Sequence, residues 1–110
     1  MPQYLYRIRP TRPAMLTDAP TEQEESIIGQ HFHYLQGLLA EGVVLMAGRT
    51  LTADERAFGI VIIAAASEAA AADVVQNDPA VRHGIMTADL FPYRVALWSP
   101  TGPKVDDEGD

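Results

Sequence analysis

The stretch VVLMAGRTLTADERAFGIVIIAA, residues 43–65, holds two β-strands in succession and lies between two predicted helices. Apolar and branched residues at 43–47 and 58–65 are typical of strands, and the polar residues 51–56 between them indicate a hairpin connection. The nearly continuous apolar run of the second strand favours a central place in a sheet, although the first strand could equally be central.

The residues that precede this stretch predict one strand and one long helix. Tyrosine and branched residues alternate with other residues over 3–9, which indicates a strand, and three prolines then make a loop of 10–20. Thr21 and Glu24 form a capping-box pattern, so we expect a helix to begin there. Gly42 is a typical residue to end it.

The residues that follow predict a second helix and a last strand. Ser67 is a good N-cap for an alanine-rich helix over 68–77, which Asp78-Pro79 ends. Residues 86–99 contain the last strand. Its best-supported positions are Tyr93, Val95, Leu97 and Trp98.

The predicted order β-α-β-β-α-β is the ferredoxin-like arrangement, an α+β fold. It gives a four-stranded antiparallel sheet with both helices on one face. The other face stays open, and the strands carry apolar side chains in both directions. A second copy packed sheet to sheet is the simplest cover, so we expect a homodimer or a dimer-based oligomer. One domain of residues 1–100 and an acidic, disordered tail of 101–110 complete the prediction.

Composition excludes several classes of protein. The chain has 110 residues, of which 47% are hydrophobic and 21% charged, the balance of one globular domain. A net charge of −7 without a basic cluster argues against nucleic-acid binding. No apolar run approaches the ~20 residues of a membrane span. Without cysteine there is no disulfide and no thiolate, and the first residues lack a signal-peptide pattern, so we expect a cytoplasmic protein.

The three histidines differ in their expected surroundings. Helical periodicity puts His31 in the middle of the apolar face of the first helix, and it puts His33 on the solvent side. His83 falls in a polar turn. His31 is therefore either a core histidine with both nitrogens satisfied or a histidine at the floor of a pocket. His31 and His33 face opposite sides, so they cannot share a metal ion, and we expect no metal site.

Asp78 also has two interpretations. Aspartate before proline is an ordinary N-cap for a short helix, and caps are far more common than catalytic pairs. Alternatively, Asp78 is the carboxylate that orients or charges His31.

Three further residues are candidates for substrate binding. Arg49 follows a predicted buried strand and is either a surface charge or an anion clamp at the strand end. Arg9 lies on one side of the first strand and either binds a carboxylate or pairs with acidic residues. Tyr93 is a core or interface aromatic that borders the opening of the sheet.

Several motifs together resemble the YciI-like (YCII-related) family of the dimeric α/β-barrel superfamily. The similarity runs from about Tyr4 to Leu97. The motifs that carry it are His31-Phe32-His33-Tyr34-Leu35, Leu38-Leu39, Glu41-Gly42, Leu45-Met46-Ala47-Gly48, the strand Gly59 to Ile63, Ser67-Glu68-Ala69, Asp78-Pro79 with Gly84, and Pro92-Tyr93-Arg94.

The resemblance implies a subunit whose sheet packs on that of a partner to close a barrel. It also implies a histidine–aspartate pair in the active site, by position His31 and Asp78, in a superfamily that includes a dehydrochlorinase of chlorinated hydroxyquinols and muconolactone isomerase. The chain departs from the family pattern in the pocket lining: Gly48-Arg49 replaces a common glycine-proline, Ala80 replaces an aromatic, and residues 24–29 lack a common arginine. The substrate therefore does not carry over.

The sequence supports two hypotheses. The first is a cofactor-free lyase or isomerase that acts on a small aromatic-derived or carboxylated metabolite, with His31 as general acid/base and Asp78 orienting it. The second is a non-catalytic small-molecule-binding or dimerisation module in which the contact between the two residues is structural.

Overall fold

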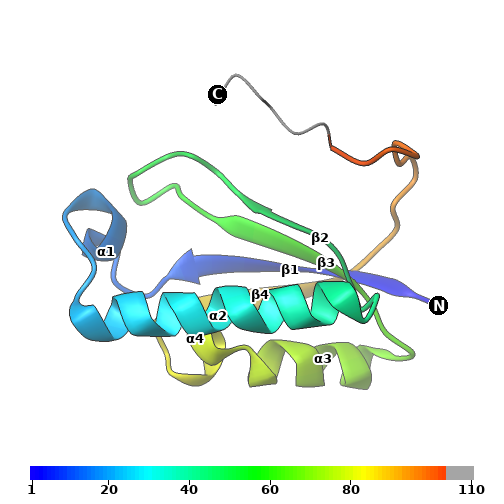
Figure 1. Ribbon diagram of the computed structural model, residues 1–110, viewed down its shortest axis with the longest axis horizontal. Coiled ribbons are helices and arrows are strands. Elements are labelled where there is room, and N and C mark those ends of the chain that lie inside the picture. Colours follow the sequence, from blue (N-terminus) through cyan, green and yellow to red (C-terminus); the bar gives the residue numbers. More distant parts are fainter. Residues whose placement is uncertain (104–110) are drawn as a thin grey trace.

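A computed structural model describes residues 1–103 of the chain, and the order of its elements matches the predicted α+β fold (Figure 1). Two short helices, α1 and α4, add to the predicted six elements. The elements are β1 (Gln3–Pro10), α1 (Ala14–Thr17), α2 (Glu22–Ala40), β2 (Val44–Arg49), β3 (Gly59–Ala64), α3 (Glu68–Asn77), α4 (Pro79–Arg82) and β4 (Met86–Tyr93).

The four strands form one antiparallel sheet in the order β2-β3-β1-β4. The strand over 59–64 is central, as its apolar run predicted, whereas the strand over 44–49 lies at the edge. Both long helices, α2 and α3, cover the same face of the sheet, and no long helix of residues 1–103 covers the opposite face (Figure 1).

Strand alternation builds the core between the sheet and the helices. Tyr6 pairs with Val61 on one side and with Leu90 on the other, and paired residues of neighbouring strands share a face. Tyr6 and Val61 are almost completely buried, at 0% and 1% exposed. From the helices, Leu35 of α2 and Val75 of α3 pack against this layer.

The ends of α2 follow the sequence signals closely. The backbone N–H of Glu24 donates to the Thr21 hydroxyl at 3.1 Å, and the backbone N–H of Thr21 donates to the Glu24 carboxylate at 2.8 Å. These two bonds are the predicted capping box. At the other end, Gly42 has φ +80°, a conformation that glycine adopts without strain.

Two expectations about the chain differ from the structure. The proline-rich segment 10–20 contains the one-turn helix α1, which buries Met15. The last strand ends at Tyr93, which pairs with Gln3, the first residue of β1. Pro2 precedes Gln3 and has no backbone N–H with which to continue the ladder. The expected strand positions after Tyr93 therefore lie outside the sheet, and Leu97 is 92% exposed.

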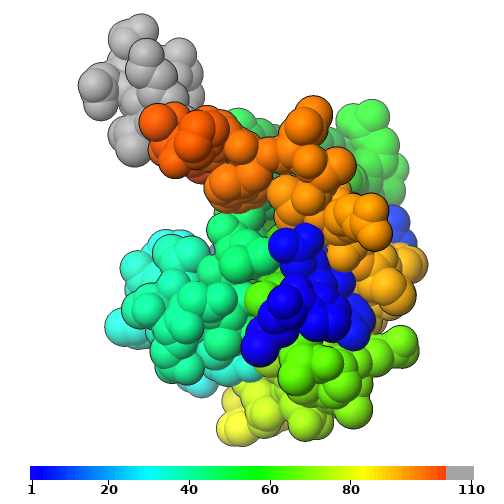
Figure 2. Space-filling view, turned by 90° about the vertical axis from the view of Figure 1, so that its right-hand side faces the viewer, coloured from blue at the N-terminus to red at the C-terminus, as the bar shows by residue number. Residues whose placement is uncertain are grey.

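The segment after β4 rises from the sheet on the side away from the helices (Figure 2). Residues 104–110, which hold the acidic end of the predicted tail, lie outside the described part of the chain. Within residues 1–103, no helix combines the length and the apolar character needed to cross a membrane.

The apolar face of α2 is wider than the stripe of residues that the helix buries. Ile27 and Leu35 are buried, but Phe32 is 62% and Leu39 is 55% exposed. Both exposed residues lie at the margins of this apolar face. There the helix surface curves away from the sheet on which the helix packs.

Candidate active site

His31 lies on the buried stripe of α2, as helical periodicity predicted. It is one turn from Ile27 and one turn from Leu35, which are 4% and 8% exposed. Its own side chain is 12% exposed. The ring atom Nδ1 lies 2.7 Å from Oδ1 and 2.9 Å from Oδ2 of Asp78. His33 is exposed on the opposite side of the helix.

Asp78 occupies the junction between α3 and α4 and is completely buried. Its Oδ1 accepts a hydrogen bond of 2.9 Å from the backbone N–H of Ala80, which makes it the N-cap of α4, and Pro79 follows as the first helical residue. The same carboxylate contacts His31. The capping position and the contact with the histidine therefore coexist in one side chain.

Tyr6 of β1 is a third member of this cluster, and the sequence predicts it only as one of the alternating residues of the first strand. Its hydroxyl donates to Asp78 Oδ2 at 2.9 Å. Burial, and then the charge of Asp78, raise the pKa of Tyr6 far above its usual value of 10, so the phenol stays protonated. Strand alternation puts Tyr6 on the helix side of β1, but no local signal pairs it with a residue so distant in the chain.

The hydrogen-bond pattern fixes which nitrogen of His31 carries the proton. A carboxylate only accepts, so Nδ1 must carry a hydrogen whether the imidazole is neutral or cationic. In the neutral ring, Nε2 is then the nitrogen with a free lone pair. A buried carboxylate is costly unless it is hydrogen-bonded, and Asp78 meets this requirement through Tyr6, His31 and Ala80.

His31 borders a pocket of about 330 Å³ between α2 and the end of the sheet where β2 and β3 join their hairpin. This size is at the lower end of small-molecule sites. Among the described residues, no acidic side chain lines the pocket, and its walls are mostly apolar. The walls include Ile8, Leu16, Ile28, Leu35, Phe58 and Met86.

Arg49 lies at the same pocket as His31. Strand β2 extends two residues beyond its predicted end, and Arg49 pairs there with Gly59 of β3. Its side chain is exposed, and it forms no ion pair with any residue between 1 and 103. The pocket therefore combines one histidine and one guanidinium with apolar walls.

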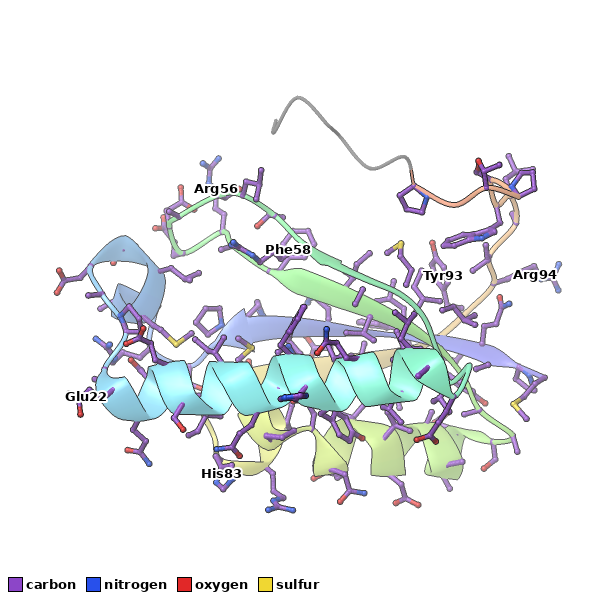
Figure 3. The ribbon with its side chains drawn as sticks, in the orientation of Figure 1. Glu22, Arg56, Phe58, His83, Tyr93 and Arg94 are labelled. Atoms are coloured by element: carbon purple, nitrogen blue, oxygen red, sulfur yellow. The ribbon has the colours of Figure 1, made fainter. Side chains whose placement is uncertain are left out.

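The other two candidate binding residues lie apart from this pocket within one chain. Arg9 is on the open face of the sheet, with Nη2 3.4 Å from Oδ2 of Asp89. Tyr93 ends β4 opposite Gln3, and Figure 3 shows it far along the sheet from Phe58. His83 is exposed on the helix side of the molecule (Figure 3). No group of three metal-ligating side chains occurs among the described residues.

Helix α1 closes one end of the pocket through Leu16, and an ion pair ties its segment to α2. The Arg12 guanidinium bonds both oxygens of Glu24, at 2.9 Å and 2.6 Å, and also the carbonyl of Ala19. These hydrogen bonds from Arg12, followed by the backbone bond from Thr21, lower the pKa of Glu24 to about 2.

The fold and this cluster define a small α+β subunit with a buried histidine–aspartate contact beside a small-molecule-sized pocket. Residues 4–99 match the YCII-related domain, so the chain belongs to the YCII-related family. A comparison with curated proteins finds no match.

Among solved structures, a similar one is 5-chloro-2-hydroxyhydroquinone dehydrochlorinase (TftG) of Burkholderia phenoliruptrix AC1100, in complex with 2,5-dihydroxybenzoquinone. The TM-score is 0.61 with 20% sequence identity, and the alignment covers 91% of this chain and 99% of the dehydrochlorinase. At this identity the similarity shows a shared fold. The expected ferredoxin-like architecture and the expected family are both confirmed.

Proposed function

We propose that the protein is an enzyme of the lyase or isomerase type that moves a proton on a small molecule, with His31 as the general acid/base. The observation that carries this proposal is the placement of His31. A buried carboxylate holds its Nδ1, while its ring borders an apolar pocket. A histidine held in one tautomer beside such a pocket is equipped to take and return a proton through Nε2.

Asp78 has the role of an orienting group. As Nε2 accepts a proton from the substrate, the ring becomes an imidazolium next to a carboxylate that is 2.7 Å away, which stabilises the charge. In a lyase, the same proton abstraction lets a leaving group such as chloride depart with the electron pair of its bond. In an isomerase, Nε2 returns the proton to another atom. Neither reaction requires a cofactor.

The pocket favours a small, mostly apolar substrate with one anionic group, such as an aromatic-derived or carboxylated metabolite. Arg49 supplies the positive charge, and no acidic residue of the described chain lines the pocket to repel an anion. Arg9 and Tyr93 lie on or near the open sheet face, so they contribute to binding only if a second copy of the chain packs there. We include that homodimer in the proposal.

A non-catalytic binding module is the alternative. It is favoured by the fact that every contact of Asp78 also serves the fold, because the carboxylate caps α4 and ties β1 to α2. In that case, His31 needs to be only a satisfied core residue.

The test is a thermal-shift screen with 2,5-dihydroxybenzoquinone, substituted benzoates and short unsaturated dicarboxylates, and a chloride-release assay with 5-chloro-2-hydroxyhydroquinone. We expect a compound that stabilises the wild type and is turned over. His31→Ala should abolish turnover, because it removes the proposed general acid/base. His33→Ala should behave as the wild type, since His33 points to solvent on the same helix. Equal turnover in the two variants would contradict the proposal.

A further inference from the structure

Three side chains from separate elements meet at one point: Tyr6 from β1, His31 from α2, and Asp78 from the junction of α3 and α4. We propose that Tyr6 is a positioning residue, which fixes the plane of the Asp78 carboxylate and thereby holds His31 in the tautomer with the hydrogen on Nδ1. This inference rests on the proposed function for its catalytic consequence. Its structural content can be tested without any substrate.

Two hydrogen bonds besides that of His31 fix the carboxylate. The backbone N–H of Ala80 donates to Oδ1 and the Tyr6 hydroxyl donates to Oδ2, each at 2.9 Å. The last torsion of an aspartate has a broad energy well, so a single bond to Oδ1 does not fix the plane. The bond from Tyr6 to the second oxygen does. His31 then faces both oxygens, at 2.7 Å and 2.9 Å.

The Tyr6 bond is also one-directional. Asp78 is completely buried and its carboxylate can only accept, so the tyrosine must donate. Tyr6 is itself 0% exposed, so bulk solvent does not reach the oxygen that it holds. Removing the hydroxyl leaves Oδ2 with His31 as its single partner and frees the carboxylate to turn about its bond to Ala80. The neutral imidazole is then no longer held in one orientation.

Tyr34 provides a matched control for this change. It lies on α2 one turn from His31, and its hydroxyl donates to the backbone carbonyl of Val74 at 2.6 Å. Tyr34→Phe therefore removes another tyrosine hydroxyl, a partly buried one, from the same region and leaves all the bonds of Asp78 in place.

The experiment is a long-range proton–nitrogen correlation spectrum of protein labelled with ¹⁵N-histidine, recorded at a pH where His31 is neutral. The wild type should show the His31 nitrogen shifts of a single tautomer, with a protonated Nδ1 and an unprotonated Nε2. In Tyr6→Phe, the two nitrogen shifts should move toward each other as both tautomers become populated. Tyr34→Phe should match the wild type. Unchanged His31 shifts in a folded Tyr6→Phe protein would overturn the inference.

A second measurement uses the wild type alone and does not depend on how the variant folds. The Tyr6 hydroxyl proton and the His31 Nδ1 proton point to the same carboxylate, so the Overhauser spectrum should contain a cross-peak between them. Its absence would also overturn the inference.

The catalytic consequence has a separate readout. With a substrate from the screen, Tyr6→Phe should lower kcat and leave KM unchanged, because Tyr6 does not line the pocket. An unchanged kcat would overturn the catalytic part of the inference. Full turnover in His31→Ala would refute the proposed function and leave the tautomer result intact, so the two failures can be told apart.

Discussion

Asp78 shows how one side chain can serve the fold and the site together. It caps a helix as local sequence rules predict, and the same two oxygens bind residues 47 and 72 positions away in the chain. A substitution that removes the carboxylate therefore disturbs both the helix junction and the histidine. The choice of replacement decides which effect dominates.

We expect Asp78→Ala to lower the free energy of unfolding by about 3 kcal/mol, since it removes the cap and leaves the buried Tyr6 and His31 donors unpaired. Asp78→Asn should cost about 1 kcal/mol. Its amide oxygen can still cap Ala80, and its NH₂ group can donate to a His31 Nδ1 that has lost its hydrogen. Urea denaturation measures both values.

Asp78→Asn should nevertheless suppress turnover, because Nε2 then carries the hydrogen and can no longer accept a proton. A well-folded Asp78→Asn protein with wild-type turnover would mean that Asp78 acts only as a helix cap. The proposed role of Asp78 in orienting His31 would then be withdrawn.

At the level of single residues, sequence analysis succeeds where a signal is local. Helical periodicity alone predicts that His31 faces the sheet, and strand alternation predicts only that Tyr6 shares a face of the first strand with Tyr4 and Ile8. The residues alone do not decide whether His31 contacts Asp78, and only the family resemblance favours that contact. The Tyr6 contact was missed, since no periodicity encodes a meeting of residues from separate elements.

Among the elements, α1 lies next to an ion pair that links its segment to α2, and it also buries Met15. Arg12 bonds both oxygens of Glu24, and Leu16 of the attached helix forms an end wall of the pocket. The capping box that holds Glu24 was predictable from a four-residue pattern. The Arg12 partner and the one-turn helix were not, because prolines in the segment indicated only a loop.

This ion pair predicts how stability changes in acid. Arg12 lowers the pKa of Glu24 to about 2, below its ordinary value of 4.5, so the pair stabilises the folded state above pH 4.5 and loses that effect as the pH falls toward 2. Glu24→Gln should therefore be less stable than the wild type at pH 7, and the two should converge near pH 2.

Urea denaturation at several pH values measures this difference. Glu25→Gln is the matched control, since it removes the same charge from the same turn at an exposed position. A constant gap between the wild type and Glu24→Gln from pH 7 to pH 2 would show that the cost comes from packing rather than from the ion pair.

At the scale of the whole molecule, one face of the sheet has no long helix packed on it in the described part of the chain. Side chains of Leu5, Ile62 and Phe91 lie on this face, since the register pairs them across three neighbouring strands. Phe91 is 45% exposed. An apolar face of this kind is typical of an interface between subunits.

We expect a homodimer formed through this face. Sedimentation equilibrium at micromolar concentration should give a mass of twice 12.0 kDa or a multiple of it. Phe91→Asp should shift the protein toward the monomer, because it places a charge in the interface without disturbing the core of one subunit. Leu39→Asp, at an exposed site on the helix face, should leave the mass unchanged. A folded wild-type monomer would exclude the dimer.

The sheet order β2-β3-β1-β4 has a kinetic consequence for the site. The first strand of the chain lies between the third and the last, and its pairing with β4 joins residues as far apart as Gln3 and Tyr93. Such distant pairings are slow to form, because closing a long loop costs conformational entropy before any contact offsets that cost. The pocket borders β1 and β4 through Ile8 and Met86, so its walls are complete only after both strands have joined the sheet. A nascent chain should thus complete the pocket beside His31 in the last steps of folding.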